Sequence, residues 1–225
     1  RPPPAAGSPA PGGFDARTHH ANYARGGAAA VSVLTEPTEF RGELEHLAHA
    51  AEVLKPNRPA MRKDFLVDPY QVLEARAAGA GGVLVILAML DDATVRALVD
   101  CARRCGMFVL LEAFDRADLE RLAAYDAPAA GGPQILAGVN CRDLRDLQVR
   151  FERFVELGPH LPRHLKTVAE SGIGSAADVD AVAEAGYRLA LVGSSLMSAA
   201  DPAPALAGLI AAGRATVAGR QSVCS

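Results

Sequence analysis

The stretch GVLVILAMLDDATVRALVDCARRCGMFVLLE, residues 82–112, decides the fold. It opens with an apolar run at residues 82–87, passes through a polar turn, and continues at 92–105 with apolar residues at helical spacing. A second apolar run follows at 108–112. This order predicts a parallel βαβ unit, because parallel strands need a long crossover that is usually a helix.

The same order of apolar run, polar turn and Ala-rich helical stretch recurs seven times along the chain. The predicted strands are residues 29–34, 60–63, 82–87, 108–112, 135–140, 167–170 and 189–193. Helices are predicted near residues 39–54, 69–78, 92–105, 116–125, 151–157, 176–185 and 201–212. Each strand is a nearly unbroken apolar run, which is typical of parallel strands that are covered on both faces.

Seven such units suit either an open, doubly wound sheet or a closed barrel. An open dinucleotide-binding fold normally has a G-x-G-x-x-G turn after its first strand, and no such motif is present. The sequence therefore predicts an α/β fold of the (βα)8 TIM-barrel type, in a single domain over residues 1–225. Its first strand is predicted to be truncated or irregular, because the Pro- and Gly-rich residues 1–13 suit a strand ladder poorly.

Composition excludes several classes of protein. The 225 residues include 23 basic and 26 acidic ones with the signs interspersed, so the chain has no basic stripe for nucleic acid. No apolar run approaches the roughly 20 residues that a membrane span needs. Four unevenly spaced cysteines do not make a disulfide framework, which favours a cytoplasmic location. The proline-rich opening without Met is interpreted as a cut or degraded start.

Polar residues or glycines stand at the carboxyl ends of five of the predicted strands, where barrels assemble their active sites. They are Lys63, Glu112, Asn140, Glu170 with Ser171, and Gly193 with Ser194. Strand ends are also commonly solvated, so each residue alone has a purely structural interpretation. Together they indicate a functional rim at the carboxyl ends of the strands.

Lys63 is one of only three lysines, against twenty arginines. A lysine at a barrel mouth can act as a proton donor or an amine nucleophile, which arginine cannot do. The alternative is a structural ion pair with Asp64 or Glu112.

Two glycine-bearing turns, ESGIG (170–174) and VGSSL (192–196), follow the last two predicted strands. In barrels these turns often hold a phosphate through backbone N–H groups and the start of a short helix. The alternative is glycine as ordinary turn punctuation.

Six motifs together carry a specific resemblance. They are SVLTE (32–36), MRKDFL (61–66), DPYQVLEAR (68–76), GVNCRDL (138–144), AESGI (169–173) and LVGSSLM (191–197). In order and spacing the chain resembles the indole-3-glycerol phosphate synthase family of tryptophan biosynthesis, from about residue 8 to the C-terminus.

The resemblance implies a carbon–carbon lyase that needs no metal or organic cofactor. Its substrate would be a small phosphosugar that bears an anthranilate ring, 1-(2-carboxyphenylamino)-1-deoxyribulose 5-phosphate. The enzyme closes the indole ring and releases carbon dioxide and water. Association with other tryptophan-pathway enzymes is a further expectation.

The resemblance also implies residue roles. Lys63 matches the catalytic lysine and Glu112 the glutamate beside it. The other matched positions are Asn140, Arg142, Glu170 and Ser171 around the substrate, Leu34, Phe40, Phe65 and Leu191 in an apolar wall, and Ser8, Gly172, Gly193 and Ser194 at the phosphate.

One departure stands against full activity. The family has a Glu-x-Lys pair in its first strand, and the matching positions here are Pro3 and Ala5. Either the chain is a fragment or has a misassigned start, or the strand has been lost. The alternatives to a lyase are therefore a phosphosugar-binding pseudoenzyme or pathway partner, and a different phosphosugar barrel such as a ketose isomerase or Schiff-base aldolase. His160 and His164 have metal-ligand spacing, but no third ligand is evident and no metal site is predicted.

Overall fold

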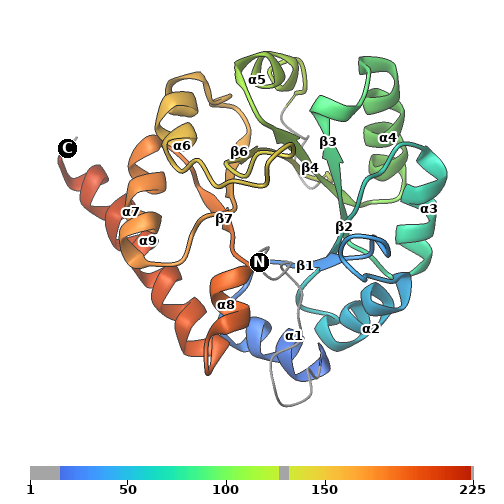
Figure 1. Cartoon of the computed structure of the whole chain (residues 1–225), viewed down its shortest axis with the longest axis horizontal. Coiled ribbons are helices and arrows are strands. Elements are labelled where there is room, and N and C mark those ends of the chain that lie inside the picture. The colour runs from blue at the N-terminus through green and yellow to red at the C-terminus, as the bar shows by residue number, and fades with distance from the viewer. Residues whose placement is uncertain (1–15, 127–131, 224–225) are drawn as a thin grey trace.

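The computed structural model describes residues 16–126 and 132–223, and seven parallel strands form its centre. The strands curl around a common axis with the helices outside them (Figure 1). They are β1 (Val31–Leu34), β2 (Ala60–Lys63), β3 (Gly82–Ile86), β4 (Phe108–Ala113), β5 (Ile135–Asn140), β6 (Lys166–Glu170) and β7 (Leu189–Leu191). Each strand pairs with the next in sequence order, and within the described residues no pairing joins β7 to β1. The predicted seven βα units are confirmed.

The helices alternate with the strands. They are α1 (Ala16–Arg25), α2 (Leu44–Leu54), α3 (Pro69–Ala77), α4 (Asp92–Arg104), α5 (Arg116–Leu122), α6 (Glu152–Leu157), α7 (Ala176–Ala185), α8 (Ser194–Ser198) and α9 (Pro202–Val223), with 3-10 turns at Leu87–Met89 and Gly158–His160. Asp68, Asp91, Asp115 and Ser175 cap four of them by accepting a backbone N–H of the first turn.

Several predicted boundaries were wrong. Helix α2 begins at Leu44 rather than at residue 39, because the preceding segment forms an irregular loop. Helix α9 continues to Val223 instead of ending at 212, and β7 ends at Leu191 instead of 193. The sequence did not predict α1 or α8.

Apolar side chains form two layers on either side of the strands. The larger layer fills the space between the strands and the helices. The smaller one fills the ring itself, and its buried members are Met61, Leu84, Ile86, Leu110 and Val168. Side chains alternate across a strand, so the residue two positions beyond each of these also faces the ring interior. Interior rows that begin at Met61, Leu110 and Val168 therefore end at the carboxyl ends of β2, β4 and β6.

No helix in residues 16–126 and 132–223 is long and apolar enough to cross a membrane.

Candidate active site

The three interior rows end in Lys63, Glu112 and Glu170, which lie together above the apolar interior. Lys63 Nζ lies 3.4 Å from Glu112 Oε2. Both glutamates are only 1% exposed, whereas the lysine side chain is 27% exposed and reaches the mouth of the barrel. The predicted convergence of Lys63 and Glu112 at one rim is confirmed, and Asn140, the third residue of that prediction, ends the strand beside Glu170. The ion pair of Lys63 with Glu112 also forms, and Asp64 takes a different partner.

Burial and charge act on this cluster in opposite directions. Burial lowers the pKa of Lys63, but the charge and the hydrogen bond of Glu112, together with the nearby Glu170 carboxyl group, outweigh it and leave that pKa above its ordinary value. Burial raises the pKa of Glu170 well above its ordinary value, and the Glu112 charge raises it further against the opposing effect of Lys63. The lysine is therefore a charged acid at neutral pH, and Glu170 favours its neutral form.

A glycine on β5 makes room for the Glu170 carboxyl group. Gly138 lies in register with Glu112 on one side and with Val168 on the other. A Cβ at position 138 would collide with Glu170 Oε1 and lie 3.0 Å from Leu110 Cδ1. The absence of a side chain at Gly138 thus allows Glu170 to occupy the interior.

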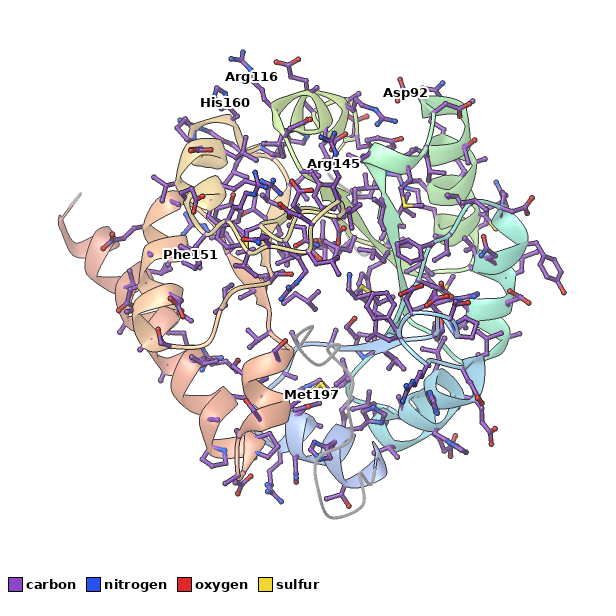
Figure 2. The ribbon with its side chains drawn as sticks, in the orientation of Figure 1. Asp92, Arg116, Arg145, Phe151, His160 and Met197 are labelled. Atoms are coloured by element: carbon purple, nitrogen blue, oxygen red, sulfur yellow. The ribbon has the colours of Figure 1, made fainter. Side chains whose placement is uncertain are left out.

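Asn140 ends β5 in register with Glu170 and is 6% exposed. Its Oδ1 accepts the backbone N–H of Arg142 at 2.9 Å. The Arg142 guanidinium donates to the Leu147 carbonyl at 2.7 Å, and a β-bridge pairs Arg142 with Val149. Arg142 therefore braces the loop 141–151, which crosses in front of the strands between the labelled Arg145 and Phe151 (Figure 2).

The turns after β6 and β7 lie against each other. Ser171 and Gly172 both have positive φ angles, 71° and 70°, and for serine this is an uncommon conformation. Ser195 Oγ donates to the Ile173 carbonyl at 3.1 Å and so joins the two turns. The turn glycines Gly172 and Gly193, together with Ser194 at the start of α8, consequently lie in adjacent segments.

The predicted apolar wall is partly assembled. The rings of Phe40 and Phe65 are 6.4 Å apart between centroids. Phe65 and Leu191 pack against the interior cluster, and Leu34 is half-buried at the end of β1. Ser8, the fourth predicted phosphate residue, lies outside the described residues, as do Pro3 and Ala5.

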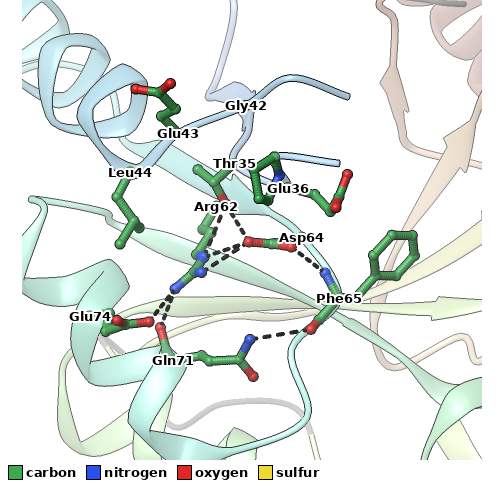
Figure 3. Close-up of a pocket in the computed structure, with 11 residues that line it drawn as sticks. Thr35, Glu36, Gly42, Glu43, Leu44, Arg62, Asp64, Phe65, Gln71 and Glu74 are labelled. Carbon is green, nitrogen blue, oxygen red and sulfur yellow. Dashed lines mark hydrogen bonds and ion pairs between the residues drawn. The ribbon is translucent and has the colours of Figure 1, made fainter. Parts of the chain in front are cut away.

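Sequence reasoning missed a buried network behind the site. Arg62 is 5% exposed and donates to Asp64 Oδ2 at 2.9 Å, to the Gln71 carbonyl at 2.8 Å and to Glu74 at 3.3 Å. Thr35 Oγ1 donates to the same Asp64 oxygen at 2.6 Å (Figure 3). The network ties the end of β1, the end of β2 and helix α3 together directly behind Lys63. The available signal was the alternation of side chains along MRKD, because it places Arg62 on the face of the strand away from Lys63.

Glu36 organises the loop that carries Phe40. Its carboxylate accepts the backbone N–H groups of Thr38, Glu39 and Phe40 at 2.7–3.1 Å. The irregular segment before α2 is therefore held by one side chain, which explains why the helix starts later than the periodicity predicts.

Two of the remaining candidate groups contact backbone carbonyl oxygens. Burial raises the pKa of the Cys141 thiol to about 11, and its Sγ donates to the Ser171 carbonyl. His164 Nε2 contacts the Tyr125 carbonyl oxygen at 2.9 Å. Among the residues that the structure describes, no group of three or more His, Cys, Asp or Glu side chains could hold a metal ion.

A parallel barrel whose rim holds a lysine against buried carboxylates defines a barrel enzyme of acid–base chemistry. Comparison with known proteins shows its family. Residues 6–209 match the family described as indole-3-glycerol phosphate synthase. The chain belongs to this family, and the resemblance seen in its motifs is confirmed.

Curated relatives named indole-3-glycerol phosphate synthase support the assignment. The protein from Rhizorhabdus wittichii is 43% identical over 192 residues, which cover 85% of this chain and 69% of the relative. That of Streptomyces griseus is 43% identical over 193 residues, which cover 86% of this chain and 68% of the relative.

Solved structures show the same fold at low sequence identity. The 3-hexulose-6-phosphate synthase of Salmonella typhimurium has a TM-score of 0.63 at 19% identity, over 82% of this chain and 87% of its own. Orotidine 5'-phosphate decarboxylase of Pyrococcus horikoshii has a TM-score of 0.64 at 14% identity, over 90% and 96%. The barrel is thus shared beyond the family.

Proposed function

We propose that this chain is a carbon–carbon lyase that converts 1-(2-carboxyphenylamino)-1-deoxyribulose 5-phosphate to indole-3-glycerol phosphate in tryptophan biosynthesis. The observation that carries the proposal is the charged Lys63 Nζ, held 3.4 Å from the buried Glu112 at the mouth of the barrel. Membership of the family supplies the reaction, and the pair supplies the acid that ring closure needs.

Ring closure begins when the aryl carbon attacks the substrate ketone, and the ketone oxygen must gain a proton as the bond forms. Lys63 donates that proton. Glu112 orients the ammonium and favours its charged form, because a buried carboxylate stabilises a neighbouring cation. Glu112 thus keeps the Lys63 amine protonated between turnovers.

The apolar wall binds the aryl ring. Phe40 and Phe65, with Leu34 and Leu191, offer hydrocarbon surface for it, which suits an aromatic ring and disfavours the anthranilate carboxylate. Loss of that carboxylate as carbon dioxide relieves the unfavourable contact. Asn140 and Ser171 supply polar groups beside the ring. Arg142 acts indirectly, because it holds the loop 141–151 through its hydrogen bonds to Asn140 and Leu147.

The phosphate group binds in the two adjacent turns. Gly172, Gly193 and Ser194 offer backbone N–H groups there, and the hydrogen bond from Ser195 to Ile173 supports a shared site. Ser8, which lies outside the described residues, is the fourth position that the family resemblance assigns to the phosphate. The reaction needs no metal or organic cofactor, and we expect residues 1–225 to act as one barrel domain in the cytoplasm, in association with other enzymes of the pathway.

Product fluorescence tests the proposal. Wild-type protein should form a fluorescent indole product from the substrate, and Lys63→Met should lose about 10²–10⁴ of that rate. Arg116→Met, on the exposed face of α5, is the control and should keep full activity. Wild-type protein without turnover would contradict the proposal.

Pro3 and Ala5 favour a second candidate function, a phosphosugar-binding pseudoenzyme or pathway partner. In that case the protein binds the phosphate ester and does not turn it over. Borohydride trapping of a sugar phosphate on Lys63 would instead identify a Schiff-base aldolase.

A further inference from the structure

The Glu170 carboxyl group is buried beside another carboxyl group, that of Glu112, and has no N–H donor. It is 1% exposed, and no N–H group of the described residues donates to either of its oxygens. A buried carboxylate with no donor is costly, whereas a neutral carboxylic acid is far cheaper to bury. Gly138 leaves the space for this group, so the packing is built to hold it here.

The charges around Glu170 do not balance. Glu112 from β4 and Lys63 from β2 are the charged groups that act on it within the described residues. One ammonium faces two buried carboxyl groups, and that ammonium already pairs with Glu112. A proton retained on Glu170 removes the excess negative charge. The raised pKa of Glu170 agrees with this excess of negative charge over positive charge.

We propose that Glu170 is a catalytic acid of the dehydration step: it carries a proton at neutral pH and delivers it to the hydroxyl group that leaves the closed ring. The proposal rests on the lyase function. Glu170 ends the interior row beside that of Asn140 and lies next to the Lys63–Glu112 pair, so it faces the same reacting atoms. Lys63 serves ring closure, and Glu170 serves the loss of water.

The step balances in atoms and electrons. The C–O bond of the ring-closed intermediate breaks, and its oxygen leaves with the bonding pair and the Glu170 proton as water. The Glu170 carboxylate then accepts a proton from the neighbouring CH2 carbon, whose C–H pair becomes the double bond of the indole. Glu170 is protonated again when the product forms.

Replacement of Glu170 by glutamine tests the delivery of the proton. Glu170→Gln keeps the shape and neutrality of the acid but cannot release a proton, so product formation should fall by about 10²–10⁴. Mass spectrometry of quenched reactions should show an intermediate heavier than the product by one water. Glu170→Asp should recover part of the rate, and Glu120→Gln on exposed α5 is the matched control. Wild-type turnover in Glu170→Gln would overturn the proposal.

Stability as a function of pH tests the retained proton separately. An acid with a raised pKa keeps its proton in the folded state while the unfolded chain loses it, so stability falls as pH rises from the ordinary carboxyl pKa toward the raised one. Glu170→Gln cannot titrate and should escape this fall. The melting temperature of Glu170→Gln minus that of wild type should therefore increase as pH rises through that window. A difference between the two melting temperatures that does not change with pH would overturn the proposal.

The two proposals fail in different ways. Wild-type protein that forms no indole product contradicts the lyase function and with it the delivery step. The melting curves of wild type and Glu170→Gln are measured without substrate, so they still decide whether Glu170 holds a proton.

Discussion

The Arg62 network should be the largest single contribution of charged groups to stability near the site. Arg62→Met keeps a long, unbranched side chain but removes every hydrogen bond of the guanidinium. It leaves Asp64, whose side chain is 10% exposed, without its cation and removes the hydrogen bond from Arg62 to the Gln71 carbonyl. Breaking a buried pair by removing one partner costs about 3–5 kcal/mol.

Thermal unfolding measures this loss. In a chain of this length each kcal/mol corresponds to roughly 2–4 °C, so the melting temperature of Arg62→Met should fall by about 6–20 °C. Arg116→Met removes an arginine that is 66% exposed and paired with Glu120, and surface pairs contribute about 1 kcal/mol or less. Equal shifts in the two variants would refute the reasoning.

A double-mutant cycle with Asp64→Asn shows whether the network acts as a unit. Thr35 and Arg62 share one oxygen of Asp64, so the two substitutions should remove the same interaction and add to less than the sum of their separate effects. Strict additivity would show that Arg62 and Asp64 act independently. The same variants should also lower the reaction rate. Asp64 directly follows Lys63 and accepts the backbone N–H of Phe65, so a change at Asp64 should shift the backbone that positions Lys63.

Three further predictions concern other residues at the carboxyl ends of the strands and in the turns after them. Gly138→Ala should displace the Glu170 carboxyl group and destabilise the fold by about 1–3 kcal/mol, which thermal melting and product fluorescence detect together; an unchanged rate would contradict the placement of Glu170. Inorganic phosphate should raise the melting temperature of wild type, and Gly193→Leu should abolish the shift; a shift that persists would move the phosphate site elsewhere. Iodoacetamide at pH 8 should spare Cys141 until the chain unfolds, because the pKa of this buried thiol is about 11; rapid labelling, mapped by mass spectrometry, would refute this.

Much of the fold could be predicted from the sequence because buried strands have a distinctive apolar composition. Strands covered on both faces need unbroken apolar runs, and β2 and β5 were predicted to the residue. Helix α1, with the sequence ARTHHANYAR, has few apolar residues and so no periodic signal. Helix α8 spans only five residues, which is too short for periodicity to show.

The candidate site was predictable where it depends on strand alternation and not where it depends on loops. Lys63, Glu112 and Glu170 follow apolar residues by two positions, and this spacing alone brings them together. The Arg142 guanidinium holds the Leu147 carbonyl, a contact set by the conformation of the loop 141–151. No periodicity in the sequence encodes that loop.

Side chains that alternate along β2 also have different roles, one in stability and the other in catalysis. Arg62 points toward the helices and joins β1, β2 and α3, whereas Lys63 points into the ring and meets Glu112. The outward Arg62 has hydrogen-bond partners for its guanidinium, whereas no N–H group of the described residues donates to the interior Glu170 carboxyl group. An incomplete set of partners costs stability and leaves a proton available for transfer. For this reason substitutions at Arg62 should act first on melting, and substitutions at Glu170 should lower activity while they relieve the pH-dependent loss of stability.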